Sequence, residues 1–355
     1  MAYPEPPNSK SAVKRAGIAI SENRATTEDF DLVDRWRASH GYVINTFQAW
    51  LKGHINKKSY SVEFAQRLKR RNTVLGKLER RNSEGKLLIS DVSSMHDFAG
   101  CRMIFDNIDE LVDFRSHIHS TATMRNVAHQ LRHEDNPEKY NYIEHPKFTG
   151  YRGIHDVYRH FPRGSERSQT KKPWDSLLVE IQYRTRAQHA WATAVEISDL
   201  LDGEQTKFEL DQSDRGRFFA LSSEIIARQH ENLSKAYSDR SNQSLRSELQ
   251  TLENNMGILR RLKVLRQFED EEKLSRHNVL NIYRDEWGGL ALDVLPFSSP
   301  SAAIEKASEL ESSDDSLNAV YVRSDNPKQL RSAYRNYFND PVDFVQIIQE
   351  EGNVG

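Results

Sequence analysis

The chain has 355 residues, long enough for two domains or for one large domain with an appendage. Its 50 Lys and Arg residues nearly balance 52 Asp and Glu residues, so only local clusters of charge can attract anionic partners. No apolar run approaches the ~20 residues of a membrane span, the N-terminus lacks an apolar signal segment, and the single Cys101 excludes a disulfide framework and a cysteine-rich zinc site. These features predict a cytoplasmic protein with no zinc and no membrane partner.

The first part of the chain changes character twice. Residues 1–25 are polar, and we expect them to be flexible. From Thr26 onward, apolar residues recur at helical spacing behind an acidic first turn, which predicts a long helix through Leu51. Between residues 60 and 200, short alternating segments such as CRMIF and LLVEIQYR stand among helical stretches. This pattern indicates a mixed α/β or α+β domain built on one sheet.

The second half of the chain predicts helices followed by a small folded tail. Residues 214–274 are charged and poor in glycine, so we expect a helical connector. After it, VLNIYRDE, LALDVLPF and NAVYVRSD are typical of strands, with one helix between the second and third and two more helices at the end. The predicted divisions are therefore 1–25, 26–213, 214–274 and 275–355, the last in ββαβα order.

The segment LLVEIQYRT carries polar side chains on one face of a predicted strand. Side chains alternate between the faces of a strand, so Glu180, Gln182 and Arg184 share the face opposite three apolar residues. Taken alone, this pattern more often marks an ordinary solvent-exposed face.

Two further segments combine polar side chains with glycine. In HDFAGCRMIF, Asp97 precedes an alternating strand and Gly100 allows a tight turn, a good position for a Mg²⁺ ligand or for a simple cap. In PKFTGYRGIHDVY, glycines flank Tyr151. An exposed Tyr151 beside Lys147 and His155 could stack on a nucleobase, and partial burial of the ring is the alternative.

A dense basic cluster begins at Arg67. If the segment QRLKRRNTVLGKL starts extended, Arg67 and Lys69 share a face, and Asn72 can cap a helix that carries Thr73 and Lys77. The N–H groups at such a helix start, together with the cations, predict a cradle for a triphosphate. A solvated basic face is the alternative.

In their order along the chain, these segments resemble the synthetase region of the RelA/SpoT alarmone enzymes. The motifs are R-x-K-x-x-x-[ST]-x-x-x-K from Arg67, D-x-x-G-x-R from Asp97, K-x-x-G-Y-x-x-x-H from Lys147 and E-x-Q-x-R-T from Glu180. Each motif is weak alone, whereas four in this order are specific. The resemblance implies an α+β fold, with a mixed β-sheet nucleotidyltransferase-like core flanked by helices.

The resemblance also implies a role for each motif residue. The enzyme would move pyrophosphate from ATP to a ribose 3′-hydroxyl with the help of Mg²⁺, which Asp97 and Glu180 would bind. The implied ATP-binding residues are Arg67, Lys69, Thr73, Lys77 and Arg102, the acceptor-binding residues are Tyr151, Lys147 and Gln182, and the catalytic residues are Asp97, Glu180, His155 and Arg184. The dipeptides His96-Asp97 and His155-Asp156 imitate the metal pair of a hydrolase, and we attribute both to chance.

The tail resembles the C-terminal domain of CapRel-type fused toxin–antitoxin proteins, which is similar to a zinc finger without its metal. Residues 275–355 contain no cysteine, in keeping with that form. The resemblance implies that Tyr334 and Tyr337, on one face of a predicted helix, plug the ATP site, although the pair could instead pack its own small core. The apolar stretch PVDFVQIIQ suits an anchoring helix. A phage structural protein such as a major capsid protein would be the activating partner.

Three functional hypotheses remain open. The first is a self-inhibited toxin of phage defence that modifies the 3′-terminal adenosine of tRNA and blocks translation, with basic residues between Arg163 and Lys172 gripping tRNA phosphates. The second is a small alarmone synthetase that makes (p)ppGpp from GDP or GTP. The third is an inactive RNA-binding or sensor module, which the intact Asp97 and Glu180 pair disfavours.

Overall fold

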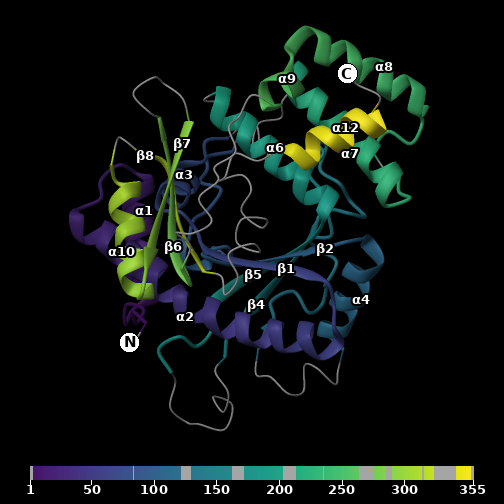
Figure 1. Cartoon of the computed structure of the whole chain (residues 1–355). Helices are drawn as coiled ribbons and strands as arrows, with labels where there is room; N and C mark the ends of the chain where they lie inside the picture. Colours follow the sequence, from purple (N-terminus) through teal and green to yellow (C-terminus); the bar gives the residue numbers. More distant parts are fainter. Residues whose placement is uncertain are drawn as a thin grey trace.

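The computed structural model describes residues 3–82, 84–120, 129–161, 172–202, 213–234, 236–263, 275–284, 290–313, 316–323 and 341–352. The described strands form one 8-stranded sheet in the order β3-β4-β5-β2-β1-β8-β6-β7 (Figure 1). The strands are β1 (Val62–Leu68), β2 (Ala99–Phe105), β3 (Gln130–Leu131), β4 (Ile154–Arg159), β5 (Leu178–Thr185), β6 (His277–Arg284), β7 (Leu290–Phe297) and β8 (Ser316–Arg323). Among them, β2 and β5 pair in parallel and the other pairs are antiparallel, which confirms the predicted mixed α+β fold.

Two helices cover one face of the central strands. They are α2 (Thr27–Lys58), which lies below the sheet in Figure 1, and α4 (Ile108–His119). The long helix begins where the sequence predicts, because Thr26 and Asp29 form a reciprocal capping box. Its Phe47 and Leu51 are fully buried in the same core as the apolar side of β5.

Residues 1–25 differ from the expectation of a flexible segment. They contain α1 (Lys10–Ser21), which is capped by Ser9 and packs on α2 and on the short 3-10 helix η1 (Val92–Ser94). Val13, Ala16 and Ile20 form a buried stripe on α1 at helical spacing. The stripe consists of a few apolar residues within a polar segment, so the overall polarity of the segment concealed it.

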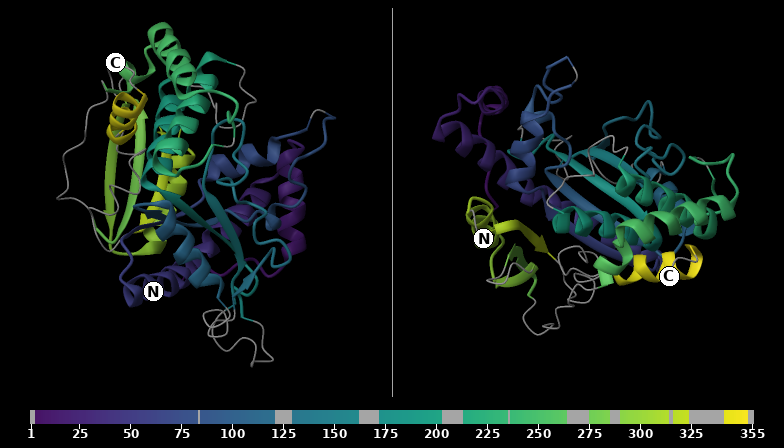
Figure 2. Two further views of the ribbon diagram at one scale, coloured as in Figure 1. Left: turned by 90° about the vertical axis from the view of Figure 1, so that its right-hand side faces the viewer. Right: turned by 90° about the horizontal axis from the view of Figure 1, so that it is seen from above.

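A second apolar cluster lies on the other side of the sheet. It joins α6 (Arg186–Asp202), α7 (Asp214–His230), α8 (Asn242–Met256), α9 (Ile258–Lys263) and α12 (Val342–Gly352) (Figure 2). The predicted helices of the connector are confirmed over the residues of α7, α8 and α9. Gly257 separates the last two with a positive φ of 61°, a conformation that glycine adopts without strain. None of the helices in the described ranges is long and apolar enough to cross a bilayer.

The tail follows the predicted order over the residues that the structure describes. Strands β6 and β7 come first, then α10 (Pro300–Glu311), β8 and finally α12. The predicted helix that contains Tyr334 and Tyr337 lies outside the described residues.

The tail strands do not form a sheet of their own, although the sequence predicts a separate small domain. Strand β8 pairs with β1 at Gln66↔Arg323 and Arg67↔Val322, so the tail continues the core sheet. This pairing covers the edge of β1, which would otherwise present unpaired backbone groups. Helix α12 instead packs against α6, α7 and α9. The tail therefore contacts the rest of the chain at two places, through β8 at the sheet and through α12 at the helices.

We expect α12 to be part of the cooperatively folded structure. Phe344 is fully buried, and its ring centre lies 5.8 Å from that of Phe219 on α7. Phe344→Ala should lower the free energy of unfolding by about 3 kcal/mol, because the smaller side chain leaves a cavity. Chemical denaturation measures this change, and Gln346→Ala, at an exposed position of the same helix, is the matched control. Equal stability of the two variants would contradict the packing of α12.

Candidate active site

The strand register places the predicted site residues on the face opposite α2 and α4. Arg67 pairs with Gly100, and Gly100 pairs with Glu180, so the two side chains lie in one row with a glycine between them. On β4, His155 pairs with Gln182 of β5 and joins this face. The predicted alternation along β5 is confirmed, because its apolar residues lie in the main core.

Gly100 has a different role from the expected tight turn. It lies inside β2 and is not one of the glycines with positive φ, which include Gly150 and Gly153 beside Tyr151. A Cβ atom at Gly100 would meet only the carbonyl oxygen of Arg67, at 3.7 Å. No side chain therefore stands between Arg67 and Glu180 in this row of the sheet.

Asp97 is held between two lysines. Lys69 follows β1, and Lys77 lies on α3 (Arg71–Glu79) together with Thr73. Each lysine Nζ lies 2.6 Å from Oδ2 of Asp97. The basic motif and the carboxylate motif thus meet at one point, as the predicted cradle requires.

The charges of this cluster shift the pKa values of its members. Burial alone would raise the pKa of Asp97, but Lys69 and Lys77 outweigh it and hold the pKa well below its usual range. Burial lowers the pKa of Lys69 to about 8 against the opposing effect of Asp97. Asp97 is therefore a stable anion, and Lys69 is a cation close to its titration point.

The start of α3 is not capped in the expected way. Its N-cap residue is Arg70, whose side chain makes no capping hydrogen bond. Asn72 instead lies in the first turn and donates from Nδ2 to the carbonyl oxygen of Glu311 at 2.9 Å. A residue of the tail therefore contacts the helix that the sequence assigns to the ATP phosphates.

A chain of hydrogen bonds links the remaining catalytic candidates. Nδ1 of His155 lies 3.1 Å from Oε1 of Glu180, and its Nε2 lies 2.5 Å from the hydroxyl of Tyr151. Arg184 donates to the same hydroxyl at 3.0 Å. Gln182 donates to Oε2 of Glu180 at 2.6 Å. The polar residues of two separate motifs thus form one connected group.

The same contacts set the protonation of this group. Burial opposes a charged His155, but Tyr151 and Glu180 raise its pKa to about 9. Burial would raise the pKa of Tyr151, whereas Arg184 and His155 lower it to about 7. Against the effect of burial, His155 and His96 hold the pKa of Glu180 well below its usual value. Near neutral pH, His155 is a cation beside the carboxylate of Glu180.

Tyr151 is not the exposed ring that the stacking hypothesis requires. Its exposed fraction is 8%, and it packs in the second apolar cluster with Trp191. Lys147 and Arg184 lie over the ring at 5.3 and 5.2 Å from its centre. Gly150 permits the close approach of this loop to α7, because a Cβ atom there would lie only 3.0 Å from the backbone of Ala220. Stacking of a base on Tyr151 would need rearrangement of its neighbours.

Sequence reasoning missed two aromatic residues of the site. Nε2 of His96 lies 3.5 Å from Oε1 of Glu180, although the sequence offered it only as half of a chance pair with Asp97. Tyr142 is half-buried, with its ring 5.4 Å from that of His155 and the Lys147 ammonium 4.5 Å above it. Neither residue belongs to a motif, so only spatial proximity identifies them.

The other predicted residues also reach this face. Arg102 pairs with Gln182 in the sheet and is buried, while Arg67 is partly exposed on β1. Thr73 lies one turn before Lys77 on α3, so both point to the same side of the helix.

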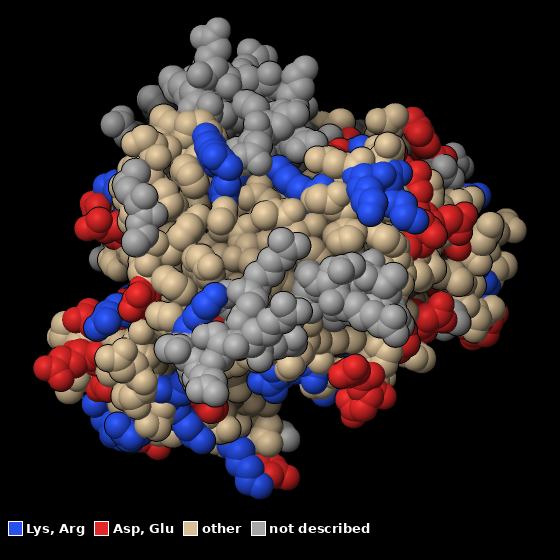
Figure 3. All heavy atoms as spheres, turned by 90° about the horizontal axis from the view of Figure 1, so that it is seen from below, with Lys and Arg blue, Asp and Glu red and all other residues tan. Residues whose placement is uncertain are grey.

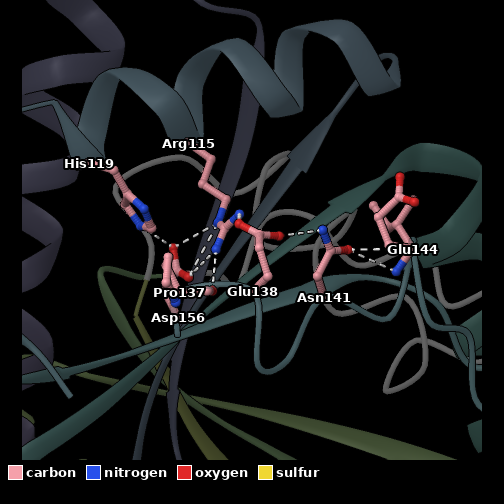
Figure 4. A network of polar contacts seen from close by, with 8 residues as sticks. Arg115, His119, Pro137, Glu138, Asn141, Glu144 and Asp156 are labelled. Carbon is pink, nitrogen blue, oxygen red and sulfur yellow. Dashed lines mark hydrogen bonds and ion pairs between the residues drawn. The ribbon is translucent and has the colours of Figure 1, made fainter. Parts of the chain in front are cut away.

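Asp156 belongs to a different network, on the core side of the sheet. Arg115 and His119 of α4 reach it, with Nε2 of His119 at 2.7 Å and the Arg115 guanidinium at 3.0 Å (Figure 4). Arg115 also binds Glu138, which holds the following turn. Strand alternation therefore places His155 and Asp156 on opposite faces of the sheet.

The two carboxylates have the chemistry to hold Mg²⁺ together with substrate phosphates. Glu180 is close enough for its charge to oppose that of Asp97, a repulsion that a divalent cation would relieve. No group of three or more His, Cys, Asp or Glu side chains suited to a metal occurs within the described ranges. A metal here would therefore depend on phosphate oxygens as further ligands.

A family match covers the region that carries this site. Residues 66–198 match the region found in RelA / SpoT proteins, a range that contains all four motifs. Similar solved structures include small alarmone synthetase 1 of Bacillus subtilis bound to its product pppGpp (22% identity, TM-score 0.41, 56% of this chain and 92% of that chain). Small alarmone synthetase 2 of Bacillus subtilis is similar at 17% identity and TM-score 0.40, over 54% of this chain and 91% of that chain. No curated protein matches the sequence.

The face of the sheet opposite α2 and α4, which carries the site residues, is called the polar face below. The matched region contains this face. It supports a pyrophosphotransferase of the RelA/SpoT type, in which the site residues come from β1, α3, β2, β4 and β5.

Removal of the Asp97 charge should disable the site without unfolding the protein. Asp97→Asn leaves Lys69 and Lys77 without their anion, so we expect pyrophosphate transfer to fall at least about a hundredfold. The measurement is the initial rate of AMP release at saturating ATP. Asp109→Asn, at an exposed position in the first turn of α4, makes the same chemical change outside the site. Equal rates for both variants would contradict this assignment.

The raised pKa of His155 predicts an alkaline limit to the reaction. A raised pKa means that the charged form persists below about pH 9 and is lost above it, so transfer should fall as the pH passes that value. Lys69 titrates near pH 8, so the comparison needs Lys69→Arg, which keeps its charge throughout. In that background the fall should remain near pH 9, and His155→Gln should remove it. A fall that survives in His155→Gln would assign the limit to another group.

Proposed function

We propose that the chain is an ATP-dependent pyrophosphokinase that modifies the 3′-hydroxyl of the 3′-terminal adenosine of tRNA and thereby blocks translation. The main observation in favour of a pyrophosphokinase is the set of charged side chains on the polar face. It brings the Asp97–lysine cluster and the Glu180–His155 group close enough for the charges of Asp97 and Glu180 to interact. Such a combination of fixed cations and carboxylates suits the transfer of a highly charged group.

In the proposed reaction, the ribose 3′-oxygen attacks the β-phosphorus of ATP. A new P–O bond forms there, the bond from the β-phosphorus to the oxygen bridging it to the α-phosphorus breaks, and AMP leaves with that oxygen. Lys69 and Lys77 would neutralise phosphate charge, and Arg184 and protonated His155 would stabilise the charge that develops during transfer.

Glu180 would orient the attacking hydroxyl and accept its proton. Its strongly lowered pKa makes it a weak base, so orientation and metal binding are its main expected contributions. Mg²⁺, when bound by Asp97 and Glu180 with the phosphates, would supply further charge neutralisation.

The proposal includes inhibition by the tail, as in the CapRel-type proteins that the sequence resembles. It is supported by the position of β8, whose Val322 pairs with Arg67, one of the proposed ATP-binding residues. The residues assigned to the inhibitory contact itself are Tyr334 and Tyr337. Release by a phage structural protein rests on the resemblance alone.

The choice of tRNA as acceptor rests on the same resemblance. Of the basic loop residues proposed to grip tRNA, Arg163 and Arg167 lie outside the described residues, and Lys172 lies at the edge of the described range. On the face drawn in Figure 3, Lys and Arg side chains of the described residues occur at several separate places with Asp and Glu nearby. The acceptor therefore has to be identified by experiment.

The deciding experiment offers both classes of acceptor to the full-length protein. With γ-³²P-labelled ATP, we expect label on tRNA and none on tRNA that ends in 3′-deoxyadenosine, which lacks the attacking hydroxyl. Tyr334→Ala combined with Tyr337→Ala should raise this labelling about tenfold by releasing the tail. Asp97→Asn is the inactive control.

The alternative acceptors give a different result. Label on GDP or GTP, with tRNA unlabelled, would replace the toxin proposal with a small alarmone synthetase that makes (p)ppGpp. Absence of transfer to every acceptor, in the double variant as well, would contradict both.

A further inference from the structure

The carboxylate of Glu311, the last residue of α10, lies against the first turn of α3. Its Oε2 accepts a hydrogen bond from the backbone N–H of Arg71 at 2.7 Å and lies 3.2 Å from a guanidinium nitrogen of Arg37. The exposed fraction of Glu311 is 4%. A tail residue thus contributes a buried anion to the helix that carries Thr73 and Lys77.

The start of a helix favours a negative charge, because its first N–H groups have no partner within the helix. α3 receives no such partner from its own N-cap side chain. Glu311 lies at the C-terminal end of its own helix, α10, where the helix dipole disfavours a carboxylate. Its charge is therefore stabilised by the partner helix rather than by its own.

Arg37 makes this place a built anion site rather than a bare helix end. It is 3% exposed on α2, donates from one terminal nitrogen to the carbonyl oxygen of Lys69 at 3.0 Å, and donates from the other to Ser308 of α10 at 2.6 Å. The guanidinium is thereby fixed between the tail and the backbone of a residue that binds Asp97.

Glu311 fills the site incompletely. Nε of Arg37 and Oε1 of Glu311 are both buried without a hydrogen-bond partner among the described residues. Burial raises the pKa of Glu311, and Arg37 and the Arg71 N–H only partly counter this effect. A tetrahedral phosphate has more acceptor oxygens than a carboxylate and could satisfy donors that Glu311 leaves unused.

We propose that Glu311 occupies an anion site, formed by Arg37 and the N-terminus of α3, which a phosphate group of ATP takes when α10 moves away. The tail and the nucleotide then compete for one anion site. This competition would regulate ATP binding independently of any contact made by Tyr334 and Tyr337. The inference rests on the proposed function as an ATP-dependent enzyme.

The test measures nucleotide binding by the full-length protein, without any acceptor. The probe is adenosine 5′-(α,β-methylene)triphosphate, which cannot be cleaved between the α- and β-phosphorus atoms. Glu311→Gln removes the competing charge with little change of shape, so the affinity should rise about tenfold over wild type. Glu309→Gln is the matched control, because Glu309 is on the same helix, its side chain is 68% exposed, and it pairs with the nearby Lys306.

Hydrogen exchange gives a second readout that does not depend on a variant. Binding of the probe to wild type should speed amide exchange in residues 300–311, because α10 loses its contact with α3. Unfolding curves for Glu311→Gln and Glu309→Gln show whether each variant is folded under the conditions of the binding measurement.

The outcomes separate this inference from the proposed function. If the probe binds, but Glu311→Gln has wild-type affinity and exchange in α10 does not change, Glu311 is only a structural cap and the competition is refuted. If no variant binds the probe, including wild type, the proposed ATP-dependent function fails and the inference fails with it.

Discussion

The register of β1, β2 and β5 is the constraint on which the candidate site depends. A shift of one residue would turn Arg67 and Glu180 toward α2 and expose apolar residues such as Ile181. Burial of the apolar side therefore selects the register, and the polar residues are carried to the opposite face by the alternation of the strands. The hydrophobic core thus positions the polar site residues from the opposite side of the sheet.

On that face the structure concentrates unlike charges where little water can reach. Each buried charge has a partner close by, with two lysines at Asp97 and a protonated histidine at Glu180. Isolated charges of this kind would be costly to bury, so loss of one partner should affect the others. The cations already have fixed positions before a phosphate group binds. This preorganisation lowers the reorganisation energy of the transfer step.

The tail is joined to the same framework from two directions. β8 extends the sheet beside β1, and α12 completes the apolar cluster over α6 and α7. Between these attachments in the sequence lies the segment with Tyr334 and Tyr337, while Glu311 precedes both and contacts α3. A change in the position of the tail would thus alter contacts with β1 and α3, the elements that carry the basic motif.

Local features of the sequence were sufficient for much of this description. The alternation around Glu180, the helical spacing behind the acidic first turn of α2 and the order of elements in the tail are properties of near neighbours, and each was predicted. The burial of α1, the packing of Tyr151 against Trp191, the pairing of β8 with β1 and the approach of Glu311 to α3 were not. Each of these depends on residues far away in the chain, such as Trp191 beside Tyr151 or Arg37 beside Glu311. The sequence by itself determined which side chains share a face, because periodicity is local. Only the tertiary structure decided which of them are buried and which partners they meet, because burial and pairing depend on the packing of distant segments.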